Sequence, residues 1–187
     1  MAEAVCRLAG ESGLEGVTPR DVAARAQVST GAVQRCFRTK DEMLVFAVGY
    51  VGERIGERVR ARIARSPARS AATALGHAAT GISLLREEHR AEAGVWPAFV
   101  AQAAVSEPLA GTPKANCAAL QESFTQLVAE AAQDAGRATP LDPQPEARTL
   151  LALADGLTAH VLTGHLTPHE AQDALHAHLG SLWTHSG

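Results

Sequence analysis

The basic residues of one short segment are the strongest chemical feature of the sequence. Residues 20–40 read RDVAARAQVSTGAVQRCFRTK, and after Asp21 this segment contains four basic side chains and no acidic one. Clustered guanidinium and ammonium groups bind phosphate, so the segment points to a polyanionic partner. The whole chain has a net charge of −3, which makes this positive charge a local property.

Two short helical patterns make up this segment. Thr18 is a good N-cap and is followed by a proline and an early aspartate, which together predict the start of a helix. Ser29 caps a second helix, in which Val33 and Phe37 turn inward at i, i+4 spacing. Two short helices with a tight connection predict a helix-turn-helix, whose second helix is shaped to enter a DNA major groove.

The residues of the second helix suggest how DNA would be contacted. Gly31 and Ala32 are small enough to let the backbone approach base edges, and Thr30 or Arg35 can hydrogen-bond to those edges. Basic side chains just beyond the helix suit phosphates. The alternative interpretation of this pattern is a solvated basic face on a helical hairpin. The expected interface comprises Thr30, Gly31, Ala32, Gln34, Arg35, Arg38 and Lys40.

The rest of the chain predicts a helical bundle. Apolar residues make up 46% of the sequence and aromatic residues only 4%, and the apolar residues recur with helical spacing. A long helix is expected over 41–64, followed by helical stretches at 69–86, 90–105, 114–136, 145–164 and 169–184, with prolines between them. We therefore predict an all-α fold of about nine helices. A helix-turn-helix head would span 1–45, and an effector-binding and dimerisation domain would span 46–187.

Several classes of protein fit the sequence poorly. No run approaches the roughly 18 apolar residues of a membrane span, and charged residues interrupt the N-terminal stretch where a signal peptide needs an apolar core. The three cysteines lack the spacing of a zinc site or a disulfide framework. No nucleophile motif, phosphate-binding glycine loop or paired-carboxylate pattern is present. We expect a cytoplasmic protein that is not an enzyme and that uses no cofactor.

Residues 1–46 resemble the N-terminal domain of the tetracycline-repressor (TetR) family of bacterial transcriptional regulators, through the stretch VTPRDVAARAQVSTGAVQRCFRTKDEML. The later segment EEHRAEAGVWPAFVAQAAVSEPL resembles the C-terminal domain type of choline-responsive, betaine-operon repressors. The resemblance implies a homodimer that binds a palindromic operator in double-stranded DNA and releases it when a small molecule binds. It also adds Thr18 and Arg20 to the expected DNA interface.

Three positions depart from the family pattern. Gln27 stands where the turn normally has glycine, and a left-handed backbone there would cost about 1–2 kcal/mol. Gln34 and Cys36 replace aromatic or histidine residues that contact phosphate, and a thiol is a poor hydrogen-bond donor. The first helix also begins almost at Met1, without a basic extension, so we expect modest DNA affinity or an earlier natural start. The alternative function is a helical small-molecule-binding or dimerisation protein whose head no longer reads DNA.

The predicted body offers candidates for a dimer interface and for an effector site. Two C-terminal helices are apolar on more than one side, so one side can face a partner. The interface candidates are Leu153, Leu157, Val161, Leu175, Leu179 and Leu182, with Leu153 and Leu175 expected on exposed faces. An apolar cavity with few polar groups is expected for the effector, lined by His77, Trp96, Phe99, Gln102, Phe124 and Asp155. We expect a largely apolar effector, because scarce aromatics argue against a cage for a quaternary ammonium ion.

Two polar features of the body stay open to more than one interpretation. Asp155, on an apolar helix, is expected to be either a pocket residue or a buried hydrogen-bonded carboxylate. Histidines crowd the C-terminal fifth, but no carboxylate or cysteine completes a ligand set by spacing, so we expect surface or interface histidines and no metal. These histidines are His160, His165, His169, His176, His178 and His185.

Overall fold

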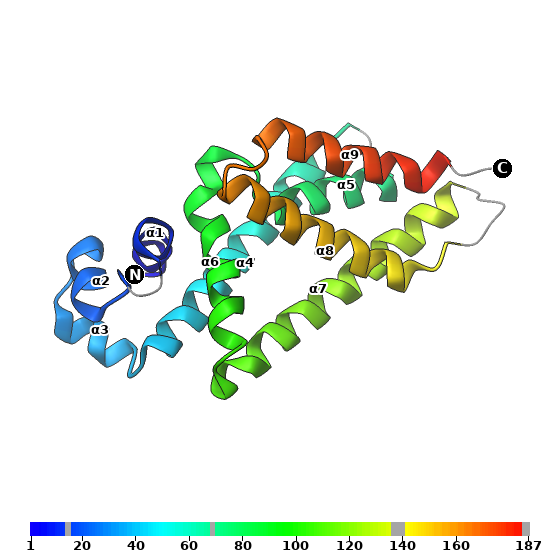
Figure 1. Ribbon diagram of the computed structural model, residues 1–187. Coiled ribbons are helices and arrows are strands. Elements are labelled where there is room, and N and C mark those ends of the chain that lie inside the picture. The colour runs from blue at the N-terminus through cyan, green and yellow to red at the C-terminus, as the bar shows by residue number, and fades with distance from the viewer. Residues whose placement is uncertain (14–15, 68–69, 136–140, 185–187) are drawn as a thin grey trace. The chain divides into compact units, whose positions relative to one another are not determined.

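The chain folds into helices throughout the part that a computed structural model describes, residues 1–13, 16–67, 70–135 and 141–184 (Figure 1). These residues form nine α-helices and one short 3-10 helix, which confirms the predicted all-α fold. The chain divides into two compact units. The first consists of Met1–Arg54 and Arg86–Lys114, and the second of Ile55–Leu85 and Ala115–Gly187.

The first unit holds the predicted three-helix head together with helices from later in the chain. Val22 and Val33, one from each helix of the predicted helix-turn-helix, are fully buried, as are Val95 and Phe99 from the later part. The unit is therefore larger than the expected 1–45 head. Its elements are α1 (Ala2–Ser12), α2 (Pro19–Ala26), α3 (Thr30–Cys36), the start of α4 (Lys40–Arg65), η2 (Glu87–His89), α6 (Arg90–Ala103) and the start of α7 (Glu107–Asp134).

Two glycines let α1 and α6 approach closely within this unit. A Cβ atom built on Gly10 of α1 would lie 3.2 Å from the Cα atom of Ala91 in α6. Gly94, one turn further along α6, faces the same point, and its added Cβ would lie 3.6 Å from the Gly10 Cα atom. Because contacts below about 3.4 Å are crowded, the absence of a side chain at Gly10 sets the spacing of these two helices.

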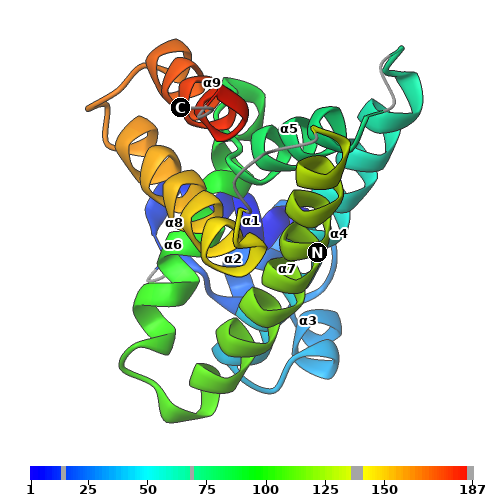
Figure 2. The ribbon, with the colours of Figure 1, turned by 90° about the vertical axis from the view of Figure 1, so that its right-hand side faces the viewer.

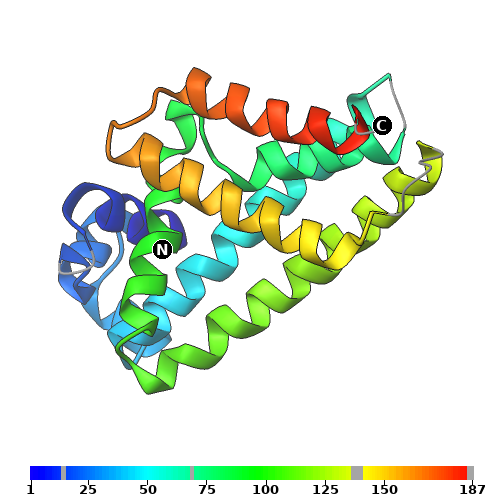
Figure 3. The same ribbon diagram turned by 45° about the vertical axis from the view of Figure 1, so that its right-hand side comes forward.

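The second unit is a bundle around an apolar core. It contains α5 (Ala71–Ile82), α8 (Pro143–Leu162) and α9 (Pro168–Thr184), together with the remainder of α4 and α7. Helices α8 and α9 run side by side, and α5 packs against both (Figures 2 and 3). The fully buried core side chains are Leu75, Ala79, Val128, Ala147, Leu150, Ala171 and Leu175.

A buried polar contact joins the end of α5 to α8. The Thr158 hydroxyl contacts the backbone carbonyls of Ser83 and Ala154, the second at 2.8 Å. The Ser83 hydroxyl donates to the Ala79 carbonyl at 2.8 Å. Thr158 and Ser83 are both buried, so these bonds satisfy groups that would otherwise be costly inside the unit.

The seventh helix differs from its prediction. A helix expected over 114–136 begins at Glu107 instead, so Pro108 and Pro113 lie inside one helix rather than between two. Pro108 falls in the first turn, where backbone amides have no intrahelical acceptor and proline is tolerated. Only Pro113 removes a hydrogen bond from the helix interior, and the expectation that both prolines separate helices is wrong.

Candidate DNA interface and effector-binding helices

Side-chain caps fix both helices of the helix-turn-helix. The Thr18 hydroxyl accepts a hydrogen bond from the Asp21 N–H at 3.2 Å and begins α2. The Ser29 hydroxyl accepts from the Ala32 N–H at 3.1 Å and begins α3. Both caps were predicted from sequence, and together they set where the second helix starts and which side it exposes.

The turn between the two helices has left-handed backbone geometry at Gln27, with φ 56° and ψ 41°. The Gln27 N–H donates to the Ala24 carbonyl at 3.3 Å, and the Val28 N–H donates to the Ala23 carbonyl at 3.0 Å. This pair of bonds is the Schellman arrangement that ends many helices, usually with glycine at the left-handed position. The strained geometry expected for Gln27 is therefore present.

The predicted DNA-contacting residues mostly lie on the surface. Gly31 faces open space, since a Cβ atom built there would meet no heavy atom within 4 Å. Packing within the chain therefore gives no reason for a glycine at this position. The exposed members of the predicted set are Arg20, Thr30, Gly31, Gln34, Arg35 and Arg38, and the half-buried members are Thr18, Ala32 and Lys40.

The start of α4 positions Arg38. The Arg38 backbone N–H donates to the Glu42 carboxylate at 2.6 Å, and the Glu42 N–H donates to the Thr39 hydroxyl at 3.1 Å. These reciprocal bonds around the helix start resemble a capping box, which the macrodipole of α4 favours because it places a carboxylate in the first turn. Cys36, at the end of α3, is exposed.

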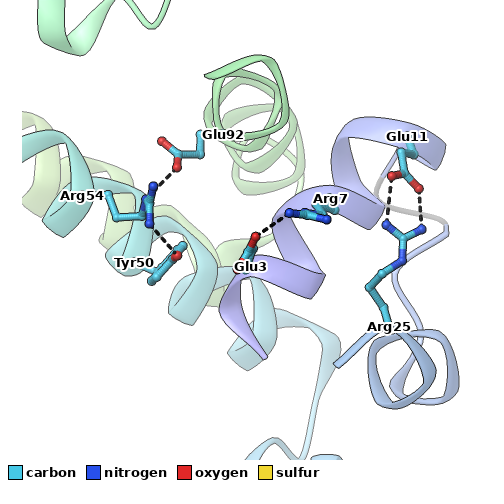
Figure 4. Close-up of polar contacts among 7 residues, drawn as sticks. All are labelled: Glu3, Arg7, Glu11, Arg25, Tyr50, Arg54 and Glu92. Atoms are coloured by element: carbon cyan, nitrogen blue, oxygen red, sulfur yellow. Dashed lines mark hydrogen bonds and ion pairs between the residues drawn. The ribbon is translucent and has the colours of Figure 1, made fainter. Parts of the chain in front are cut away.

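Arg25 does not contribute its charge to the DNA-facing surface. It forms two hydrogen bonds to the Glu11 carboxylate, at 2.9 and 2.6 Å, and so joins α2 to α1 (Figure 4). Hydrogen bonding to Arg25 holds the pKa of Glu11 below its ordinary value, and the same bond raises the pKa of Arg25. The charge of Arg25 is therefore balanced by Glu11 within the chain.

A second ion pair joins α4 to α6. The Arg54 Nε atom donates to the Glu92 carboxylate at 2.8 Å, and Arg54 Nη1 donates to the Tyr50 hydroxyl at 3.2 Å (Figure 4). The Glu92 side chain is only 14% exposed, so solvent screens this pair less than a fully exposed one. Sequence reasoning missed both Arg54 and Glu92. The only local signal was the i, i+4 spacing of Tyr50 and Arg54.

The predicted effector-site residues fall into both units. In the first unit, Trp96 and Phe99 stack with ring centroids 6.3 Å apart, Phe99 is fully buried and Gln102 is half-buried. In the second unit, Phe124 belongs to the core and His77 is half-buried on α5. Their role as effector contacts stays a prediction.

Two expectations about side-chain exposure are wrong. Asp155 is exposed, so it is not the buried hydrogen-bonded carboxylate that one interpretation expected. Leu175 has no exposed surface, although the pattern placed it on an exposed face. Of the predicted interface residues only Leu153 and Val161 are half-buried. The others, Leu157, Leu175, Leu179 and Leu182, fill the core of the second unit and have little surface left for a partner.

Most of the C-terminal histidines contact another side chain. His178 Nε2 lies 2.8 Å from the Glu146 carboxylate across α9 and α8, and His169 lies 2.9 Å from Asp173. The rings of His160 and His165 have centroids 4.9 Å apart. Among the described residues, no three histidine, cysteine or acidic side chains are placed to hold a metal ion. His185 lies outside the described residues.

The helices of the described ranges include none that is both long and apolar enough to cross a membrane. Cys6 differs from the two exposed cysteines, because burial raises the pKa of its thiol to about 11.

Known proteins match both parts of the chain. Residues 3–46 match the family described as bacterial regulatory proteins, tetR family, and residues 71–184 match BetI-type transcriptional repressor, C-terminal. The HTH-type transcriptional regulator PksA of Bacillus subtilis (strain 168) is 30% identical over 162 residues, which is 87% of this chain and 77% of PksA.

Solved structures show the same fold. The crystal structure of a transcriptional regulator from Rhodococcus sp. Rha1 is 32% identical, with a TM-score of 0.79 over 97% of this chain and 92% of that one. A regulator from Saccharomonospora viridis in complex with choline is 19% identical, with a TM-score of 0.82 over 96% of this chain and 93% of that one. At that identity the second likeness concerns the fold alone.

Proposed function

Because the chain belongs to the tetR family of bacterial regulatory proteins and is a transcriptional regulator, we propose that it is a ligand-responsive repressor. In this proposal a homodimer binds a palindromic operator and leaves it when a small molecule binds. We propose that the protein acts in the cytoplasm, where bacterial DNA lies.

The exposed face of α3 carries this proposal. Thr30, Gly31 and Arg35 share a short helix whose start is fixed by a cap, and Gly31 has no packing role within the chain. A glycine on an exposed helix costs about 1 kcal/mol relative to alanine, so some other use of the position is needed. Close approach of the helix backbone to DNA bases is the use that the family's function supplies.

Operator binding with single substitutions tests this assignment. DNA from directly upstream of the protein's own gene serves as the first probe, since such regulators often control themselves. Lys40→Ala should weaken binding to all sequences alike and reduce the salt dependence by about one unit. Thr30→Ala and Arg35→Ala should each cost about 1–3 kcal/mol at particular operator positions. Arg62→Ala, which removes an exposed cation from the far half of α4, is the matched control. Equal, sequence-independent losses for Thr30 and Arg35 would contradict direct reading of bases.

Dimerisation is proposed through the outer faces of α8 and α9. Opposite its buried side, α8 presents Ala152, Gly156 and Ala159, and α9 presents Ala177 and Gly180. Neither glycine has any atom within 4 Å of an added Cβ, so both faces are open in the single chain. Small side chains let helices of two protomers approach to the short end of the usual 8–10 Å range, and two-fold symmetry brings identical faces together.

This revised interface has a direct test. Ala177→Glu should shift sedimentation from dimer toward monomer, because it places a charge in an apolar contact. Gln172→Glu, on the flank of the same helix, should leave the dimer intact. An undisturbed dimer in Ala177→Glu would show that another surface is used.

The switch is proposed to act through α4, whose residues belong to both units. A ligand that displaces the later part of this continuous helix must also move the earlier part, which Arg54 ties to α6. Two recognition helices must stand about 34–36 Å apart to enter successive major grooves, so a small displacement disrupts binding. Coupling of this kind is reciprocal, and operator DNA must weaken effector binding by the same factor.

A second candidate function is a small-molecule-binding protein with a head that does not read DNA. The exposed Cys36 favours it, because a thiol is a weak donor at a position where the family has phosphate contacts. Absence of any binding to DNA at low salt, where non-specific binding is strongest, would select this alternative.

A further inference from the structure

Gln34 is an exposed residue of α3 whose side-chain amide is available to a partner outside the chain. This amide forms no hydrogen bond with any residue that the structure describes. By contrast, two arginines of the head are paired within the chain, since Arg25 binds Glu11 and Arg7 binds Glu3. The α3 surface therefore presents a neutral group that can both donate and accept a hydrogen bond.

Helix geometry gives the direction of the Gln34 side chain. Side chains of an α-helix lean toward its N-terminus, so each covers the surface of the residues three and four positions earlier. For Gln34 these residues are Gly31 and Thr30. Gly31 has no side chain, and a Cβ atom built there would meet no heavy atom within 4 Å, so the space beside it is open. The amide of Gln34 therefore belongs to the same part of α3 at which the backbone would approach base edges.

The chemistry of an amide selects its target on DNA. The group holds a donor and an acceptor side by side, whereas phosphate oxygens only accept hydrogen bonds. A phosphate contact would place the amide oxygen near a negative charge without a donor, and phosphate is better bound by the exposed cation Arg38 beyond the end of α3. In the major groove only adenine presents a donor and an acceptor together, its N6 amino group and its N7 atom. The amide therefore matches adenine and no other single base.

We propose that Gln34 reads an adenine in each operator half-site through two hydrogen bonds. The Gln34 Nε2–H donates to adenine N7, and the Gln34 Oε1 atom accepts from the adenine N6 amino group. The family pattern has an aromatic residue that contacts phosphate at this position, so base reading here is a specificity of this chain. The inference rests on the proposed operator binding and adds a base identity that this function does not itself require.

Selection from a random duplex library provides the operator and the first measurement. Full-length wild-type protein should recover a palindrome with one symmetry-related adenine, and Gln34→Ala should lose the preference at that position alone. Gln34→Glu keeps the size of the side chain but has no donor, so its preference there should change to cytosine, whose amino group donates to a carboxylate. Cys36→Ala, at an exposed position on the opposite side of the same helix, is the matched control and should leave the adenine preference unchanged.

A modified base tests the hydrogen bond at the level of single atoms. 7-Deazaadenine lacks the N7 acceptor but still pairs with thymine, so it removes one of the two proposed bonds when it replaces the selected adenine. With this replacement in both half-sites, wild-type affinity measured by fluorescence anisotropy should fall about 5- to 150-fold. Gln34→Ala should bind the modified and unmodified duplexes equally. Its melting temperature should not fall, because alanine favours a helix.

Three outcomes would overturn the inference while leaving the repressor proposal intact. These are an unchanged adenine preference in Gln34→Ala, equal wild-type affinity for the two duplexes, or a loss in Gln34→Ala that is the same for all sequences and so marks a phosphate contact. Recovery of no common sequence by the wild-type protein is a different result, because it would refute operator binding and with it any base reading by α3.

Discussion

Replacing Gln27 by glycine should stabilise the head, although glycine normally destabilises. Gln27 has φ 56° and ψ 41°, a left-handed geometry that costs a residue with a side chain about 1–2 kcal/mol. Glycine relieves that cost but loses about 0.5–1 kcal/mol through the greater freedom of the unfolded chain. The difference is a net stabilisation of about 0.5–1 kcal/mol, or roughly two- to fivefold in the opening equilibrium.

Native-state hydrogen exchange in the full-length protein measures this change locally. The Val28 N–H, which closes the turn at 3.0 Å from the Ala23 carbonyl, should exchange more slowly in Gln27→Gly. Gln34→Gly is the matched control, because Gln34 is an exposed residue within α3. Its replacement should lower the free energy of local opening by about 1 kcal/mol and so make amide exchange faster. Faster exchange in both variants would refute the left-handed turn and the strain assigned to it.

Three further predictions concern packing, a buried hydrogen bond and thiol reactivity. Gly76→Ala should raise the free energy of unfolding by up to about 1 kcal/mol, because nothing lies near its added Cβ. In Gly81→Ala the added Cβ would clash with a methyl group of Val59 in α4, so urea denaturation should show about 1–3 kcal/mol less stability than for Gly76→Ala, and equal stability would contradict the packing. Thr158→Val should lower the free energy of unfolding by about 1–3 kcal/mol, because it leaves the Ser83 carbonyl after α5 unpaired. An unchanged free energy of unfolding would show that this hydrogen bond does not stabilise the fold. At pH 8, far below its pKa of about 11, Cys6 should resist a thiol reagent until the protein unfolds while exposed Cys36 reacts in the native state, and rapid native reaction of both would contradict the burial.

Local signals predicted the head well. Thr18 and Ser29 were recognised as caps because hydroxyl residues before an apolar pattern are specific signals, and both make the expected bonds. The left-handed turn at Gln27 followed from the resemblance to a family in which glycine holds that position. All of these features depend on residues only a few positions apart in the chain.

Features that depend on tertiary contacts were not predicted. Helical periodicity shows that Leu175 is apolar, but not that the core of its own protomer covers it completely. Arg54 and Glu92 are 38 residues apart, and no local pattern links them. Pro113 was interpreted as a helix end because proline removes a hydrogen bond, yet one lost bond does not end α7.

Selection from a random library of duplex DNA tests the central claim most directly. The full-length protein is mixed with the library at physiological salt, bound DNA is amplified over several rounds, and the recovered sequences are aligned. A dimer that reads DNA with α3 should recover a palindrome with half-site centres about 10 base pairs apart, and Arg35→Ala should change the preferred bases within each half-site. Recovery of no common sequence, or of a single half-site without its symmetric partner, would contradict the account.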